Sequence, residues 1–249
     1  MQLQQFFEQN PRLAVAFSGG VDSSYLLYAA DAAGCDVHAY FIKSEFQPQF
    51  ELDEAINFAK SFDITLTVEN YSVLGEPCIT ENTPDRCYQC KSKILKRLWC
   101  LASEDGFTVL CDGTNADDDE SDRPGMKALN EQVVFSPLRE CGLGKQEIRL
   151  LSKQAGLPTH DKPAYACLAT RVPEGTKITT GILEKIEHSE EALFKMGFSD
   201  FRVRLLPPGT ARIQVTGSQW SSAAAKRTEI LEALRSYFDS IVLDMDVRG

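Results

Sequence analysis

The chain has 249 residues, of which 43% are apolar and 25% are charged, and its formal net charge is −10. This composition is typical of a globular protein with one or two domains, and no apolar run reaches the roughly 18–20 residues that cross a membrane. The acidic balance disfavours nucleic-acid binding, and the first residues lack a signal-peptide pattern, so we expect a cytoplasmic protein without membrane or nucleic-acid partners.

Short apolar runs alternate with amphipathic segments over the first two thirds of the chain. The runs predict buried strands and the segments predict helices. The alternation therefore predicts an α/β fold, with a mostly parallel twisted sheet and helices on both faces. The predicted strands are 13–17, 36–42, 65–70 and 107–113, and the predicted helices are 22–34, 51–62, 86–106 and 144–156.

A different pattern begins after the segment 167–179, which contains a proline and a glycine. It predicts a small α+β module, whose three short strands cannot enclose a core alone. We therefore expect two domains, 1–171 and 178–249. The elements predicted in the second are a helix at 182–197, strands at 201–206 and 211–215, a long helix to about Phe238 and a strand at 241–247.

The sequence SGGVDS stands between the first predicted strand and the first predicted helix. Adjacent glycines let the backbone approach an anion, and the amides that open a helix favour phosphate. The serines add hydroxyl donors, and the aspartate fits a Mg²⁺ ion that bridges it to the phosphates. The lysine of a Walker loop is absent, and an N-capped helix after a tight turn is the alternative. The candidate phosphate-binding residues are Ser18, Gly19, Gly20, Asp22 and Ser23.

In this context SGGVDS resembles the PP-loop of the ATP pyrophosphatases, the adenine nucleotide alpha-hydrolase-like proteins. These enzymes split ATP between its α and β phosphates and hold the released pyrophosphate in this loop. The segment GTNADD at 113–118 follows the fourth predicted strand, at the sheet edge where ligands bind in open α/β folds. It resembles the family's second ATP- and Mg²⁺-binding segment, which implies contacts from Asn115, Asp117 and Asp118.

Further stretches are similar to the ATP-dependent sulfur transferases of nickel-pincer nucleotide synthesis, the LarE family, from about residue 10 to 215. This resemblance implies that ATP adenylates a carboxylate of pyridinium-3,5-biscarboxylate mononucleotide and releases pyrophosphate. Sulfur then displaces AMP and leaves a thiocarboxylate, for lactate racemase maturation. It also implies a homo-oligomer and a downstream nickel-inserting partner. The stretches are RCYQCK (86–91), residues 123–149, KPAYACLATR (162–171), RVR (202–204) and ARIQV (211–215).

The resemblance places the sulfur chemistry at Cys167. In one branch of the family this cysteine gives up its own sulfur and becomes dehydroalanine. In another branch three cysteines hold a [4Fe–4S] cluster, whose free iron binds a hydrosulfide. Cys87 and Cys90 form a C-x-x-C at a helix start and, with Cys167, match this second branch. A sacrificial Cys167 remains an alternative, as do redox, zinc or structural roles of the C-x-x-C, and the role of Cys78 is left open.

Arg202 and Arg204 alternate along one predicted strand and therefore lie on one face. Two guanidiniums on one face suit a phosphate, although a solvated strand edge gives the same pattern. The resemblance favours the phosphate of the nucleotide substrate as their ligand. It also implies that Lys91 and Arg171 contact anions.

Three rival functions are compatible with the same loop. A tRNA thiolation enzyme also has a PP-loop and three cysteines, but it needs a basic RNA-binding face or an added module. A relative of the NAD or GMP synthetases needs no cysteine triad. A non-catalytic adenine-nucleotide sensor would bind ATP without releasing pyrophosphate.

Overall fold

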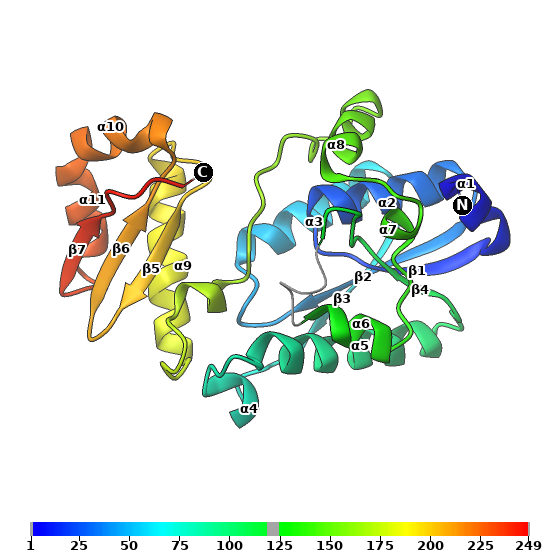
Figure 1. Cartoon of the computed structure of the whole chain (residues 1–249), viewed down its shortest axis with the longest axis horizontal. Helices are drawn as coiled ribbons and strands as arrows, with labels where there is room; N and C mark the ends of the chain where they lie inside the picture. Colours follow the sequence, from blue (N-terminus) through cyan, green and yellow to red (C-terminus); the bar gives the residue numbers. More distant parts are fainter. Residues whose placement is uncertain (1, 119–124, 249) are drawn as a thin grey trace. The chain divides into compact units, whose positions relative to one another are not determined.

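The structure, a computed structural model, describes residues 2–118 and 125–248. The chain folds into two compact units, which differ from the two domains expected from the sequence in where they divide (Figure 1). The first unit holds the residues up to Ser72 and Asp85–Lys162. The second holds Val73–Pro84 and the residues from Pro163 onward, so the chain enters it earlier than the 171–178 boundary expected from the sequence.

The segment Val73–Pro84, which contains α4 (Pro77–Thr80), belongs to the second unit because its backbone is bonded there. Ile178 donates its amide hydrogen to the carbonyl of Thr80 at 2.7 Å. The side chain of Asn82 donates to the carbonyl of Pro173 at 2.7 Å. Each bond joins residues more than ninety positions apart in the chain, and local sequence patterns do not report such contacts.

The first unit is built on a four-stranded sheet with the order β3-β2-β1-β4, and all three strand pairs are parallel. Val15 in the centre of β1 pairs with Ala39 on β2 and with Cys111 on β4. After β1 the chain adds β2 and β3 on one side of it, and β4 then pairs with β1 on the other side. The strands are β1 (Arg12–Ala16), β2 (Asp36–Lys43), β3 (Thr65–Asn70) and β4 (Leu110–Asp112).

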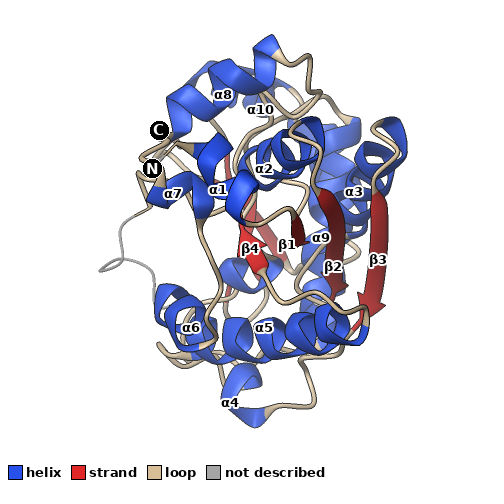
Figure 2. Ribbon diagram, turned by 90° about the vertical axis from the view of Figure 1, so that its right-hand side faces the viewer, coloured by secondary structure: helices blue, strands red, loops and turns tan. Residues whose placement is uncertain are grey.

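Helices cover both faces of this sheet, which confirms the predicted α/β class (Figure 2). Leu13 and Val15 point into one core with α1, α2, α3, α7 and α8, whereas Ala14 points into another with α5 and α6. This alternation is the period of two expected for a strand that is buried on both faces. The helices are α1 (Leu3–Gln9), α2 (Val21–Ala32), α3 (Gln49–Ser61), α5 (Arg86–Glu104), α6 (Gly125–Glu131), α7 (Pro137–Glu140) and α8 (Lys145–Gln154).

The fourth strand is shorter than the predicted 107–113. After α5, Phe107 donates its amide hydrogen back to the carbonyl of Ala102 at 2.8 Å, which closes the helix end. Pairing with β1 begins only at Leu110. The apolar run from residue 107 therefore contains a helix terminus as well as a strand, a distinction that hydrophobicity alone does not make.

The second unit is the predicted small α+β module, with the strand order β5-β6-β7. The long helix predicted before Phe238 is wrong, because Lys226 leaves helical geometry and separates two helices. Its ammonium donates to the carbonyl of Met196 at 2.6 Å, a contact that holds the break. None of the helices in the described ranges has the length and apolar character needed to cross a membrane. The elements are η1 (Leu168–Arg171), α9 (Thr180–Lys195), β5 (Arg202–Leu206), β6 (Thr210–Gln214), α10 (Gly217–Ala225), α11 (Arg227–Leu234) and β7 (Ser240–Leu243).

Candidate functional site

The loop between β1 and α2 gathers backbone amides of the kind that bind anions. Gly19 has a φ of +70°, a left-handed backbone conformation that favours glycine. Gly20 caps α2, and Ser24 donates the first intrahelical hydrogen bond to its carbonyl at 3.0 Å. The amides of residues 21–23 therefore have no acceptor within the helix, and the helix dipole adds to their attraction for phosphate.

Two serine hydroxyls brace this loop. The Oγ atoms of Ser18 and Ser23 lie 3.1 Å apart. Ser23 also donates its hydroxyl hydrogen to the carbonyl of Gly20 at 3.2 Å. The five residues predicted from SGGVDS therefore gather in one turn, and hydroxyl groups that can rotate toward an anion stand beside the amides.

Asp22, in the first turn of α2, carries a carboxylate with only one oxygen engaged. Its Oδ2 accepts a hydrogen bond from the ammonium of Lys145 at 2.6 Å. Its Oδ1 is buried and has no hydrogen-bond partner among the described residues. An unpaired buried oxygen is costly, and carboxylate oxygen is a ligand that Mg²⁺ prefers. The site therefore fits a Mg²⁺ ion held beside the phosphates of a nucleotide.

The carboxyl end of β4 meets the start of α2. Gly113 directly follows β4, and a Cβ on it would lie 2.6 Å from the backbone nitrogen of Ser23. Only glycine fits such a close approach of two backbones. The strands β2 and β3 are added on one side of β1, and β4 is added on its other side. Open α/β sheets bind ligands at the point where the strand order switches in this way, here between β1 and β4.

The predicted residues after β4 form a compact turn. Asp117 donates its amide hydrogen to Oδ1 of Asn115 at 2.9 Å, and Asn115 donates its own to Oδ2 of Asp118 at 3.0 Å. Oδ2 of Asp117 accepts the amide hydrogen of Lys145 at 2.6 Å and so caps α8. Lys145 therefore contacts both Asp117, through its amide, and Asp22, through its ammonium. Contacts of this turn with ATP or Mg²⁺ stay predictions. The rest of the predicted acidic stretch, 119–122, lies outside the described residues.

Two lysines that were not predicted lie at this loop. Lys145 pairs with Asp22, and the ammonium of Lys162 donates to the carbonyl of Gly19 at 2.9 Å. Lys145 occupies the first position of α8, where the helix dipole disfavours a cation. That placement was a usable signal in the sequence, because a cation at this end of a helix indicates a specific partner. Lys162 carried no comparable signal.

Lys91, a predicted anion contact on α5, lies beside the same sheet edge. Its ammonium is 3.8 Å from Oδ2 of Asp112, the last residue of β4. Asp112 is buried and accepts hydrogen bonds from the hydroxyls of Thr114 at 2.6 Å and Ser136 at 2.7 Å. The structure therefore gives Lys91 a protein partner, and its contact with a substrate anion stays a prediction.

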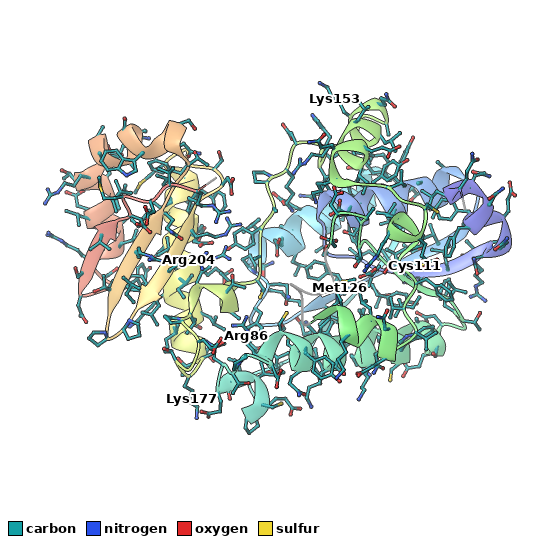
Figure 3. All side chains as sticks on the ribbon, in the orientation of Figure 1. Arg86, Cys111, Met126, Lys153, Lys177 and Arg204 are labelled. Atoms are coloured by element: carbon teal, nitrogen blue, oxygen red, sulfur yellow. The ribbon has the colours of Figure 1, made fainter. Side chains whose placement is uncertain are left out.

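The three predicted sulfur-chemistry residues are divided between the units. Cys87 and Cys90 stand one turn apart at the start of α5, with Cys87 exposed and Cys90 half-buried. The helix begins at Arg86, which is labelled in Figure 3. Side chains at this spacing share a helix face, so the pair fits two thiolate ligands of one metal centre. Cys167 is half-buried and precedes η1 in the second unit. Within each unit, the described residues include no group of three His, Cys, Asp or Glu placed to hold a metal ion.

Three arginines that were predicted to contact anions hold the backbone around Cys167. Each guanidinium donates to a carbonyl of residues 164–170, which we call the Cys167 segment. The segment is therefore fixed from before Cys167 to after it. The pairs are Arg202 with Ala164 at 2.5 Å, Arg171 with Ala166 at 2.9 Å and Arg204 with Thr170 at 2.8 Å.

Arg171 is fully buried and paired with Glu190 on α9. Their side chains are 0% and 2% exposed, and Nε of Arg171 donates to Oε1 of Glu190 at 2.9 Å. Burial disfavours the charge of Arg171, but the hydrogen bonds and the charge of Glu190 outweigh it and raise the pKa. Tyr165 and the amide of Val203 also donate to Glu190. The geometry gives Arg171 a structural role, and the predicted anion contact stays a prediction.

Replacing Glu190 by glutamine should lower the free energy of unfolding by about 3–5 kcal/mol, because it leaves a buried guanidinium without its charged partner. Urea denaturation measures the loss. The adjacent Glu191 provides a matched control, since it pairs with Lys195 on the helix surface at 2.7 Å and is 55% exposed. Glu191→Gln should change the stability by less than about 1 kcal/mol. Equal losses in the two variants would contradict the structural role of Glu190.

Positive charge accumulates on the β5 side of the second unit. Burial and then repulsion from Arg171 lower the pKa of Arg202 to about 10. Burial also lowers the pKa of Arg204, and repulsion from three neighbouring arginines adds to the effect. Nε and Nη1 of Arg204, labelled in Figure 3, are engaged, whereas Nη2 donates to no described residue. An anion bound there would relieve the repulsion. The three neighbours are Arg171, Arg212 and Arg248.

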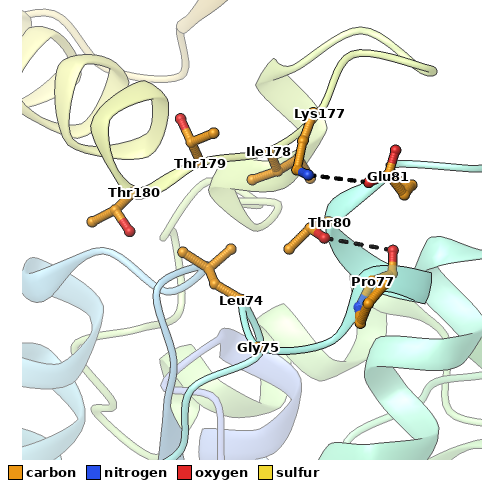
Figure 4. Close-up of a pocket in the computed structure, with 9 residues that line it drawn as sticks. All are labelled: Leu74, Gly75, Pro77, Thr80, Glu81, Lys177, Ile178, Thr179 and Thr180. Atoms are coloured by element: carbon orange, nitrogen blue, oxygen red, sulfur yellow. Dashed lines mark hydrogen bonds and ion pairs between the residues drawn. The ribbon is translucent and has the colours of Figure 1, made fainter.

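The second unit also contains a pocket of about 410 Å³ between the segment that carries α4 and the start of α9 (Figure 4). Lys177 and Glu81 form an ion pair of 3.3 Å at its wall, and the hydroxyl of Thr80 donates to the carbonyl of Pro77 at 3.5 Å. None of the predicted site residues lines it. Its lining is Leu74, Gly75, Pro77, Thr80, Glu81, Lys177, Ile178, Thr179 and Thr180.

Known proteins resemble the chain over most of its length, although no protein-family model matches it. An uncharacterised protein of Synechocystis sp. is 36% identical over 87% of this chain and 81% of its own length. The pyridinium-3,5-bisthiocarboxylic acid mononucleotide synthase of Lactiplantibacillus plantarum is 33% identical, over 78% of this chain and 71% of its own length. The tRNA-specific 2-thiouridylase MnmA of Pseudothermotoga lettingae is 27% identical, over 66% and 57% respectively.

Proposed function

Because the chain belongs to the PP-loop family of the pyridinium-3,5-bisthiocarboxylic acid mononucleotide synthase, the LarE type, we propose that it is an ATP-dependent sulfurtransferase of nickel-pincer nucleotide synthesis. Its substrate is pyridinium-3,5-biscarboxylate mononucleotide. ATP activates a carboxylate of this substrate as an acyl-adenylate, with release of pyrophosphate. Sulfur then replaces AMP and leaves a thiocarboxylate.

The observation that carries the ATP-dependent half of the proposal is the carboxylate of Asp22. One of its oxygens is buried and unpaired beside amides that have no intrahelical acceptor. A loop with a structural role alone would gain nothing from such an oxygen. A Mg²⁺ ion bound there would neutralise charge on the nucleotide's phosphates.

The residues of the loop have separable roles in the adenylation. The amides of residues 21–23 and the hydroxyls of Ser18 and Ser23 donate to the β and γ phosphates of ATP. The substrate carboxylate attacks the α phosphorus, the bond to the bridging oxygen breaks, and pyrophosphate leaves with the electron pair. The same donors stabilise the charge that develops on it. Lys145, held by Asp22, contributes positive charge at the same place.

Sulfur enters in the second half of the reaction. A hydrosulfide attacks the acyl carbon and loses its proton, and AMP leaves with the electrons of the broken C–O bond, because AMP is a far better leaving group than oxide. If the thiolate of Cys167 attacks instead, it first forms a thioester, which releases the thiocarboxylate when the α-proton is lost and the Cβ–S bond breaks, leaving dehydroalanine. We assign the sulfur chemistry to Cys167 together with Cys87 and Cys90, as ligands of a [4Fe–4S] cluster. The family resemblance and the C-x-x-C spacing support this assignment. A bound cluster would supply a site at which external sulfide is held.

Arg204→Gln should weaken binding of the mononucleotide by about 1.5–3 kcal/mol, the range for a hydrogen bond from a charged donor. Its Nη2 donates to no described residue, and repulsion among the arginines favours an anion there. Calorimetry with the mononucleotide measures the loss. ATP should bind to the variant as tightly as to the wild type. Equal weakening of both ligands would show a folding defect and contradict a phosphate contact at Arg204.

Product analysis tests the proposed function against its rivals. The protein is incubated with ATP, Mg²⁺ and sulfide, with either the mononucleotide or unmodified tRNA. We expect AMP and pyrophosphate only with the mononucleotide. Products that form only with tRNA would favour a tRNA-thiolating enzyme, to which the similarity to MnmA also points. Bound but intact ATP under both conditions would favour a nucleotide sensor.

A further inference from the structure

Lys162, the last residue of the first unit, contacts the SGGVDS loop with its side chain. Its ammonium donates to the carbonyl of Gly19 at 2.9 Å and pairs with Oε2 of Glu54, on α3, at 2.5 Å. The side chain of Lys162 is 15% exposed, whereas that of Glu54 is 50% exposed. A lysine that is mostly buried loses side-chain freedom, so its contact with the loop must compensate for that loss.

The backbone of Lys162 is fixed independently of its side chain. The guanidinium of Arg149, on α8, donates to the carbonyls of His160 and Lys162, each at 2.8 Å. The amide of Lys162 donates to the carbonyl of Thr159 at 3.1 Å. The ammonium therefore extends to Gly19 from an anchored position.

The carbonyl that Lys162 holds belongs to the peptide between Gly19 and Gly20. In a trans peptide the carbonyl and the amide hydrogen point in opposite directions. With the carbonyl turned to Lys162, the amide of Gly20 points to the serine side of the loop, where it donates to Oγ of Ser18 at 3.4 Å. A peptide between two glycines rotates easily, and the reversed peptide would turn an oxygen toward the anion.

We propose that Lys162 is a positioning residue that fixes the peptide between Gly19 and Gly20, with its amide toward the bound phosphate and its carbonyl away from it. The inference rests on the proposed function in one respect, that the loop binds pyrophosphate. It adds a role for a residue outside the loop. The ammonium acts through the loop carbonyl, and its contact with Glu54 is secondary.

Lys162→Met removes the donor, and Glu54→Gln is the matched control that leaves it in place. Two measurements apply to both variants: the amide resonances of glycine-labelled protein without nucleotide, and the affinity for pyrophosphate with Mg²⁺. In Lys162→Met we expect the Gly20 resonance to shift or broaden and the affinity to fall about tenfold or more, the usual effect of losing a charge-assisted hydrogen bond. In Glu54→Gln both should stay near wild type. Lys162→Arg, which keeps a charged donor, should restore much of the affinity.

Three results would overturn the positioning role. A loss of affinity with an unchanged Gly20 resonance would make Lys162 a direct phosphate contact. Wild-type behaviour of Lys162→Met in both measurements would remove any role at the loop. Equal effects of Glu54→Gln would assign the role to the ion pair. If wild-type protein itself fails to bind pyrophosphate, the proposed function fails, whereas the resonance without nucleotide still decides whether Lys162 fixes the peptide.

Discussion

Asp22→Asn should reduce ATP-dependent pyrophosphate release by at least about a hundredfold, because a charged metal ligand contributes several kcal/mol of stabilisation to phosphate chemistry. Asparagine keeps the shape of the side chain and can still contact Lys145. It lacks the negative charge that the buried Oδ1 would offer to the proposed Mg²⁺ ion. Pyrophosphate release is measured by a coupled assay with the mononucleotide present.

Asp31 offers a matched control on the same helix. It lies in the last turn of α2 and is exposed, so Asp31→Asn should release pyrophosphate at the wild-type rate. Thermal unfolding of both variants should match the wild type, because the pair of Asp22 with Lys145 is partly exposed and contributes little to stability. Normal pyrophosphate release by Asp22→Asn would contradict the role of this loop in ATP cleavage.

Cys167→Ala should abolish thiocarboxylate formation while AMP and pyrophosphate are still produced. In the proposed reaction the carboxylate attacks ATP before any sulfur takes part, so the first half does not need the thiol. The resulting acyl-adenylate would be lost to water. Nucleotide products are measured by chromatography, and the sulfur content of the mononucleotide by mass spectrometry. Retained thiocarboxylate formation would contradict the assignment of sulfur chemistry to Cys167.

Iron content and further cysteine variants decide whether the sulfur comes from sulfide held by a cluster or from Cys167 itself. If three thiols hold a cluster, protein reconstituted without oxygen should contain about four iron atoms per chain. Cys87→Ala and Cys90→Ala should then lose iron and sulfur transfer together. Cys100→Ala is the matched control, because Cys100 is an exposed cysteine on the same helix. Iron-free protein that makes one thiocarboxylate per chain and converts Cys167 to dehydroalanine would contradict the cluster and favour the sacrificial cysteine.

Local patterns were sufficient to predict the first unit's architecture. The apolar runs and the SGGVDS turn depend on neighbouring residues, and β1, α2 and the loop between them lie where the sequence placed them. The strand order β3-β2-β1-β4 was not predicted, because parallel connections permit several orders. Boundaries were less predictable, because the break at Lys226 depends on a contact with Met196, thirty positions earlier.

The candidate site shows a similar contrast. The motif GTNADD drew attention to Asn115 and Asp117, which share one turn of the structure. The partners of Lys145 and Lys162 could not be read from the sequence, because they lie 123 and 143 positions away. For Arg171, the sequence motif suggested a contact with an anion. The structure instead buries its side chain against Glu190, which lies on α9, and the sequence around Arg171 does not report this pairing.

Mass analysis of the nucleotide after one incubation decides whether the protein transfers sulfur at the expense of ATP. Protein with reconstituted iron and sulfide is mixed with ATP, Mg²⁺ and pyridinium-3,5-biscarboxylate mononucleotide, and the product is compared with that of a reaction without ATP. We predict a mononucleotide in which sulfur replaces carboxylate oxygen, formed only with ATP and accompanied by AMP and pyrophosphate. An unchanged mononucleotide, recovered from protein that binds both ATP and the substrate, would contradict the account.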